Sequence, residues 1–166
     1  MIEVQVARLM IDENTNSPVV VLKETDGDRV LPIWIGATEA NAIAMGLSGK
    51  RFQRPLTHDL LSTVIRGLHG NVVKILISDL KDNTFYATIL LQGERELVTV
   101  DARPSDSIAV ALRENAPIFV AEQLLDDQGG RVGPFQTTKP SAEERAAELR
   151  RHLEGMSPED FGRFQL

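Results

Sequence analysis

The chain has 166 residues, no cysteine and a formal net charge of −6 at pH 7. This length suits one domain with a substantial core, and the lack of thiols excludes disulfides and thiolate metal sites. No leader-like segment opens the chain and no apolar run is long enough to span a membrane, so we expect a soluble, cytoplasmic protein. The acidic balance argues against strong non-specific binding to nucleic acid.

Apolar periodicity in the first half predicts three strands followed by two helices. Alternating or β-branched residues favour strands at residues 2–10, 18–23 and 30–35, and the last of these places the single Trp34 in the core. Residues 37–47 have the composition of a buried helix with Thr38 as its N-cap. After a loop at 48–54, residues 57–68 form an amphipathic pattern capped by Thr57. Its apolar face comprises Leu60, Leu61, Val64, Ile65 and Leu68.

The second half repeats this order. Strands are predicted at residues 72–78, 84–91 and 96–100, a helix capped by Ser105 at 105–113, and a last strand at 117–121. Residues 19–22 align with 86–89, and 38–44 with 105–111, including the capping hydroxyl and a following acid. We therefore predict an α+β fold of internally duplicated β-β-β-α units, with a mixed or antiparallel sheet and packed helices.

Composition changes near residue 126. Residues 1–125 form the predicted domain, and residues 126–140, rich in Gly, Gln, Thr and Pro, are expected to be a linker or mobile loop. Residues 141–166 are expected to be a C-terminal helical extension. Its apolar stripe is too narrow to fold alone, so it must dock on the domain, on another subunit or on a partner.

Two similar stretches introduce the second and third predicted helices. Each contains an Arg-Pro pair, at Arg54 and Arg103, just before a Thr or Ser. A guanidinium beside a helix N-terminus makes an anion-binding corner, although it could equally tether a loop. His58 and Asp59 could serve in acid–base chemistry or metal binding, or could simply occupy the first turn of a helix.

Further charged residues could complete a site. Glu39, Asp59, Asp101 and Asp106 could supply carboxylates for Mg²⁺ or Mn²⁺, or could complement helix dipoles in first turns. Lys50, Arg51 and Arg54 surround Phe52 in a stretch without acids. Such a stretch could contact a single strand of nucleic acid or be an ordinary solvated loop.

Several motifs together resemble the bifunctional nuclease domain family and follow the family's order from about residue 2 to residue 125. The motifs are Leu31-Pro32-Ile33-Trp34-Ile35-Gly36, Glu39-Ala40, Arg54-Pro55-Leu56-Thr57-His58-Asp59-Leu60-Leu61, Phe85-Tyr86-Ala87 and Asp101-Ala102-Arg103-Pro104-Ser105-Asp106-Ser107-Ile108-Ala109. The Ser157-Pro158-Glu159-Asp160-Phe161 ending is similar to that of actinobacterial members. The resemblance implies an α+β domain and nuclease activity on DNA and RNA.

Two functional hypotheses follow. In the first, the protein is a phosphodiesterase-type nuclease assisted by Mg²⁺ or Mn²⁺. His58, Asp59 and Asp106 are then catalytic, Arg54, Arg103, Lys50 and Arg51 bind phosphate, and Glu39, Asp59, Asp101 and Asp106 hold the metal. In the second, it is a non-enzymatic oligomeric module that binds a small anion or a protein. A closed homodimer is expected because pairing covers exposed strand edges.

Overall fold

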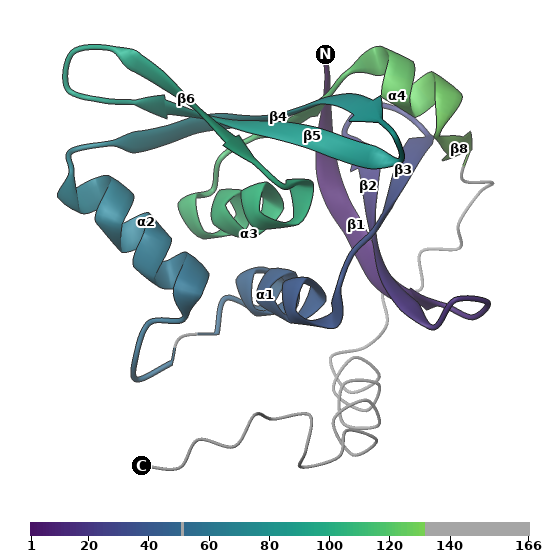
Figure 1. The fold of residues 1–166 in the computed structure, drawn as a ribbon, viewed down its shortest axis with the longest axis horizontal. Coiled ribbons are helices and arrows are strands. Elements are labelled where there is room, and N and C mark those ends of the chain that lie inside the picture. Colours follow the sequence, from purple (N-terminus) through teal and green to yellow (C-terminus); the bar gives the residue numbers. More distant parts are fainter. Residues whose placement is uncertain (51, 132–166) are drawn as a thin grey trace. The chain divides into compact units, whose positions relative to one another are not determined.

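The computed structural model describes residues 1–50 and 52–131, and within them eight strands form one mixed sheet with four helices (Figure 1). The strands are β1 (Ile2–Asp12), β2 (Ser17–Glu24), β3 (Arg29–Trp34), β4 (Asn71–Lys81), β5 (Thr84–Gln92), β6 (Leu97–Ala102), β7 (Ile118–Val120) and β8 (Gly130–Arg131). The helices are α1 (Ala37–Ser48), α2 (Thr57–Gly67), α3 (Pro104–Glu114) and α4 (Glu122–Asp127). This architecture confirms the predicted α+β class.

Two antiparallel meanders, β1-β2-β3 and β4-β5-β6, make up most of the sheet. The strand order is β6-β5-β4-β7-β1-β2-β3-β8. The short strand β7 joins the meanders because it pairs in parallel with β4 and antiparallel with β1. Each meander is followed by a helix, as predicted, whereas the internal duplication itself stays a prediction.

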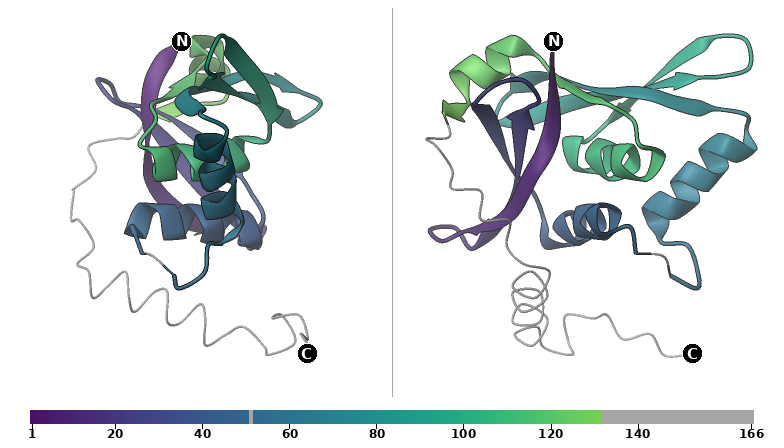
Figure 2. Two further views of the ribbon diagram at one scale, coloured as in Figure 1. Left: turned by 90° about the vertical axis from the view of Figure 1, so that its left-hand side faces the viewer. Right: turned by 180° about the vertical axis from the view of Figure 1, so that it is seen from behind.

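Helices α1, α2 and α3 gather on one side of the sheet, with α3 between α1 and the strands, whereas α4 lies near β3 (Figures 1 and 2). α3 contributes most to the core among these helices, because the consecutive residues Ile108, Ala109, Val110 and Ala111 are all buried. Both α1 and α2 pack against α3, and α1 approaches it closely at Gly46, where an added Cβ would meet Leu112. As a result, the N-terminal turns of α2 and α3 come near one another.

The structure corrects the expected burial of Trp34 and the three expected helix caps. Trp34 is 55% exposed rather than in the core, because Leu31 and Ile33 take the inward-facing positions of β3. Its indole Nε1–H donates a hydrogen bond of 2.9 Å to Asp12 Oδ2. The predicted caps Thr38, Thr57 and Ser105 are already helical. The N-cap residues are instead Gly36, Leu56 and Arg103, with no side-chain cap hydrogen bond from these positions.

Helix α2 is amphipathic as predicted, but much of its apolar face is exposed. Ile65 is buried, whereas Leu60, Leu61, Val64 and Leu68 are 40–75% exposed. The helix therefore uses only the edge of its apolar face, together with Ser62, for packing within the domain. The remaining apolar surface is left without a partner among the described residues.

Structured elements continue past residue 125, since α4 ends at Asp127 and β8 covers Gly130–Arg131. Arg29 connects this segment to the sheet. Its guanidinium lies 2.6 Å from both Glu24 Oε1 and Asp126 Oδ1. The rest of the expected linker and the helical extension at 141–166 lie outside the described residues. No helix in the described part of the chain is both long enough and apolar enough to cross a membrane.

Candidate active site

The first turns of α2 and α3 bring an imidazole and a carboxylate together across 48 residues of sequence. His58 Nε2 lies 3.1 Å from Asp106 Oδ1, and both side chains are partly buried. Each residue is in the first turn of its helix, where the backbone N–H groups and the dipole favour negative charge. The two helix N-termini noted in the sequence therefore lie close together. The contact that joins them is between His58 and Asp106, whereas the sequence had suggested the neighbours His58 and Asp59 as the working pair.

Arg103 completes the cluster from the N-cap position of α3. Its Nε donates to Asp106 Oδ2 at 2.7 Å and its Nη2 to Asp106 Oδ1 at 3.2 Å, which forms a bidentate pair. Its Nη1 lies 3.1 Å from Glu39 Oε1 in the first turn of α1. The Arg103 side chain is 66% exposed, so its outer surface remains accessible to a ligand. The cluster thus joins three helix N-termini.

These contacts keep Asp106 ionised. Burial alone would raise the pKa of Asp106, but the hydrogen bonds and charges of Arg103 and His58 outweigh it and hold the pKa below its ordinary value. The hydrogen bonds and charge of Asp106 in turn raise the pKa of Arg103, with a smaller contribution from Glu39. Since an ionised carboxylate can only accept, His58 Nε2 must carry the proton in this contact. In a neutral imidazole the lone pair is then on Nδ1.

A cleft adjoins the cluster and extends under the start of β5 and the end of β6. Asp101, whose side chain forms no hydrogen bond or ion pair with the described residues, lies on its wall together with Tyr86. The lining residues are Thr57, His58, Leu61, Thr84, Phe85, Tyr86, Ile89, Val100, Asp101, Ala102, Arg103 and Asp106. One end of the cleft is therefore ionic, and the rest is largely apolar.

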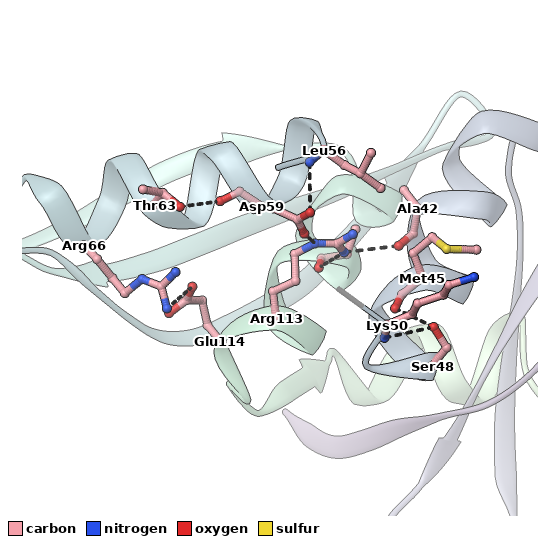
Figure 3. A network of polar contacts seen from close by, with 11 residues as sticks. Ala42, Met45, Ser48, Lys50, Leu56, Asp59, Thr63, Arg66, Arg113 and Glu114 are labelled. Carbon is pink, nitrogen blue, oxygen red and sulfur yellow. Dashed lines mark hydrogen bonds and ion pairs between the residues drawn. The ribbon is translucent and has the colours of Figure 1, made fainter. Parts of the chain in front are cut away.

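Asp59 belongs to a different network, centred on Arg113 (Figure 3). Arg113 Nε donates to Asp59 Oδ1 at 2.5 Å, and its Nη1 donates to the carbonyls of Ala42 and Ala109. The other Asp59 oxygen accepts from the Leu56 backbone N–H at 2.9 Å. The bond from Arg113 holds the pKa of Asp59 below its ordinary value, helped by the Leu56 N–H and by charge. Both Asp59 oxygens are thus engaged: Oδ1 joins α2 to α3 and, through Arg113, to α1, whereas Oδ2 accepts from the N-cap residue of α2 itself.

The predicted phosphate-binding cations do not all reach the cluster. Arg54 is exposed in the loop before α2, and no described residue forms a hydrogen bond or ion pair with it. Lys50 lies over the Phe52 ring, 5.6 Å from its centroid, at the other end of the same loop. Arg51 lies outside the described residues. Of the three predicted cations within the described residues, only Arg103 lines the cleft.

The predicted metal ligands do not form a common group. Among residues 1–50 and 52–131, no three His, Asp or Glu side chains are arranged to hold a metal ion. Asp106 and Glu39 face Arg103, whereas Asp59 faces Arg113. The carboxylates as placed here therefore do not fit a divalent cation, and the Mg²⁺ or Mn²⁺ requirement stays a prediction.

Sequence reasoning did not select Arg113 or the cleft residues Thr84 and Tyr86. Arg113 is in the last turn of α3, where a cation is expected to complement the helix dipole. Nothing in its sequence position indicates a contact with Asp59, 54 residues away. Tyr86 did appear within the Phe85-Tyr86-Ala87 motif, but without an assigned role.

The fold and the cluster define an α+β domain with an ionic cleft at convergent helix N-termini. The chain belongs to the bifunctional nuclease domain family, whose sequence model matches residues 20–132. This membership confirms the resemblance seen in the motifs. The matched region contains the whole cluster of Glu39, His58, Arg103 and Asp106.

Relatives fall into two groups. An uncharacterized protein of Mycobacterium tuberculosis is 39% identical over 163 residues, covering 96% of this chain and 97% of the relative. Bifunctional nuclease 1 of Oryza sativa subsp. indica is 26% identical over 128 residues, or 75% of this chain and 39% of the plant protein. Bifunctional nuclease 1 of Arabidopsis thaliana is 26% identical over 133 residues, or 76% and 41%. The chain thus spans about two-fifths of these plant proteins.

Proposed function

We propose that the domain hydrolyses phosphodiester bonds of DNA and RNA in the cleft beside His58, Asp106 and Arg103. The observation that carries this proposal is the contact of 3.1 Å between His58 Nε2 and Asp106 Oδ1, next to the exposed guanidinium of Arg103. An imidazole oriented by a carboxylate is suited to proton transfer, and a guanidinium is suited to binding a phosphate. Family membership supports the same reaction class.

In the proposed reaction, Nδ1 of His58 accepts a proton from the attacking oxygen. That oxygen, from a water molecule, forms a bond to phosphorus while the bond from phosphorus to the leaving sugar oxygen breaks. The leaving oxygen takes up a proton from solvent, and the His58 imidazolium then returns its proton to solvent. Asp106 holds the imidazole with its proton on Nε2 and stabilises the imidazolium that forms. Arg103 binds a non-bridging phosphate oxygen through N–H groups on its exposed side. Asp59 is assigned a structural role instead of a catalytic one.

The charge balance of the cleft implies weak substrate binding. Arg103 is paired with Glu39 and Asp106, and Asp101 also lines the cleft, so a phosphate near the Arg103 guanidinium meets more carboxylates than guanidinium groups. Arg54 and Lys50 are proposed to contact the nucleic acid outside the cleft. Together with the net charge of −6, this arrangement predicts transient binding that weakens as salt is added.

Cleavage of labelled single-stranded RNA and DNA tests the proposal, with Mg²⁺, Mn²⁺ or EDTA present. His58→Ala and Asp106→Asn should each lower the rate by about 10²- to 10⁴-fold, the usual contribution of general acid–base catalysis. His69→Asn is the matched control, because His69 is exposed and its φ of 57° suits Asn. Inactivity of folded wild type under all conditions, or full activity of His58→Ala, would exclude this site.

A second candidate is a non-enzymatic homo-oligomeric module. The exposed apolar residues of α2 favour it, because a monomer would leave them in water. Folded protein that cleaves nothing but forms a dimer would support this candidate over the nuclease. Self-association is also compatible with the nuclease, and a cytoplasmic location is proposed for both.

A further inference from the structure

Within residues 1–50 and 52–131, strand β6 is an edge strand without the usual protection against pairing. It ends the strand order and pairs only with β5, so its outer row of backbone N–H and C=O groups is unpaired within the sheet. Its sequence, Leu-Val-Thr-Val-Asp-Ala, contains no Pro, Lys or Arg. Natural edge strands commonly use such residues, bulges or covering segments to prevent pairing with another chain. The only charge in β6 is Asp101, near its end.

The apolar surface at this edge continues onto α2. In β6, Val98 and Val100 pair with Leu91 and Ile89 of β5, so they point to the same face as the buried Ile89. Val100 lines the cleft together with Leu61 of α2. Leu60, Leu61, Val64 and Leu68 fall within about 100° of the α2 circumference. The edge of β6 and the exposed stripe of α2 therefore form one apolar surface.

We propose that this surface binds a second copy of the chain, with the two β6 strands paired antiparallel about a two-fold axis at Thr99. A two-fold axis perpendicular to the sheet keeps equivalent side chains of the two protomers on the same face of the sheet. A residue that lies on the axis pairs with its own copy. With Thr99 on the axis, Val98 of each protomer pairs with Val100 of the other. Cross-strand pairs of β-branched residues and of Thr with Thr stabilise antiparallel strands.

The size of the surface fits a dimer. Six large apolar side chains on this face are 40–75% exposed. At roughly 100 Å² of apolar area per fully exposed side chain, they provide on the order of 300 Å². Because roughly 60% of an interface is apolar, an interface containing them would bury about 500 Å² on each protomer, or about 1,000 Å² in total, which is the lower end of the range for specific complexes. The six residues are Leu60, Leu61, Val64, Leu68, Val98 and Val100.

Away from the ionic end of the cleft at Arg103, a nucleic acid is a poorer occupant of this surface. Phosphate binding relies on Lys and Arg side chains. Strand β6 has neither, and the one cation of α2, Arg66, lies 3.8 Å from Glu114 Oε1. An apolar surface beside an unpaired strand edge is suited to binding another protein. An identical β6 strand can form the Val98–Val100 and Thr99–Thr99 pairs. This inference does not depend on the proposed nuclease activity.

Because the chain has no cysteine, single-cysteine variants can test the pairing directly. Residues opposite one another in antiparallel strands have Cα atoms about 4.5–5.5 Å apart, within the range that a disulfide spans. Under mild oxidation, Thr99→Cys should form a covalent dimer at least tenfold faster than Val98→Cys. In the proposed pairing, residue 98 lies opposite residue 100 of the other protomer, so the two cysteines at position 98 are only diagonal neighbours. Glu13→Cys, in the turn between β1 and β2, is the control and should stay largely uncrosslinked.

The oligomeric state gives a second readout. Light scattering with size-exclusion chromatography should give wild type twice the chain mass of 18.3 kDa. Val98→Lys should give a monomer with unchanged circular dichroism, whereas Thr15→Lys, in an exposed turn, should remain dimeric. A monomeric wild type at 100 µM would overturn the proposal. So would a dimer in which Thr99→Cys crosslinks no faster than Glu13→Cys.

Discussion

Replacing Asp59 by Ala should destabilise the fold strongly while removing no catalytic group. The substitution breaks the contact of 2.5 Å with Arg113 Nε and the bond of 2.9 Å from the Leu56 N–H. Arg113 is left with a side chain only 9% exposed and with two backbone carbonyls as its remaining partners. An uncompensated guanidinium then remains at the junction of α1, α2 and α3.

The expected loss follows from the two contacts. Loss of a helix-capping interaction costs about 1 kcal/mol, and a hydrogen bond to a charged group contributes about 1.5–3 kcal/mol. Because the Asp59 side chain is 35% exposed, solvent screening favours the lower part of that range. We expect a decrease of about 3 kcal/mol in the free energy of unfolding, or roughly 6–12 °C in Tm for a chain of this size.

Thermal and urea unfolding measure this loss, and cleavage below the transition measures function. Asp59→Ala should keep cleavage within about tenfold of wild type per folded molecule, whereas His58→Ala should lose the 10²-fold or more expected for an acid–base group. Glu94→Ala removes an equal charge from an exposed turn and should leave Tm unchanged. An unchanged Tm for Asp59→Ala, or complete inactivity of the folded variant, would refute the structural assignment.

The same contact predicts a pH dependence. The pKa of Asp59 is lower in the folded state than in the unfolded chain, because Arg113 and the Leu56 N–H stabilise the charged form. Its contribution to stability is therefore complete above the unfolded-state pKa, near pH 4, and is lost as pH falls through the lower folded-state value. Wild type should lose more stability than Asp59→Ala between about pH 5 and pH 2.

Three further outcomes are expected. Glu39→Gln should lower KM for nucleic acid, because it removes a carboxylate and frees Arg103 Nη1, whereas loss of metal-stimulated cleavage would instead identify Glu39 as a metal ligand. Arg29→Ala should increase amide hydrogen exchange in α4, because Arg29 joins Glu24 to Asp126, and unchanged exchange would show that other contacts hold α4. Fluorescence of the single Trp34 should be readily quenched by acrylamide, since its side chain is 55% exposed, and a protected signal would contradict that placement.

Most of the secondary structure follows from local sequence. Strand alternation and helical periodicity predict β1 to β7 and α1 to α3 in order, because each depends on which neighbouring residues face the core. Which strands pair with one another does not follow from local sequence. Strand β7, with only three residues, lies between the two meanders, and no local pattern indicates that it pairs with both β4 and β1.

The composition of the candidate site was predicted only in part. Sequence selected Glu39, His58, Arg103 and Asp106 because charged residues at helix starts interact with the dipole and with anions. It also selected Asp59, adjacent to His58, as a partner in the same chemistry. Successive residues of a helix point about 100° apart, so His58 faces Asp106 while Asp59 faces Arg113. The two residues therefore have different roles because their side chains point in different directions, which their adjacency in the sequence does not reveal.

The sequence by itself therefore determined the α+β class, the family and the charged helix starts, because these depend on local pattern and motif. Only the tertiary structure decided which charges meet, that Trp34 is exposed, and that the apolar stripe of α2 has no partner among the described residues. Those outcomes depend on how distant elements pack. The pairing of His58 with Asp106 spans 48 residues, and local propensity contains no information about such a contact.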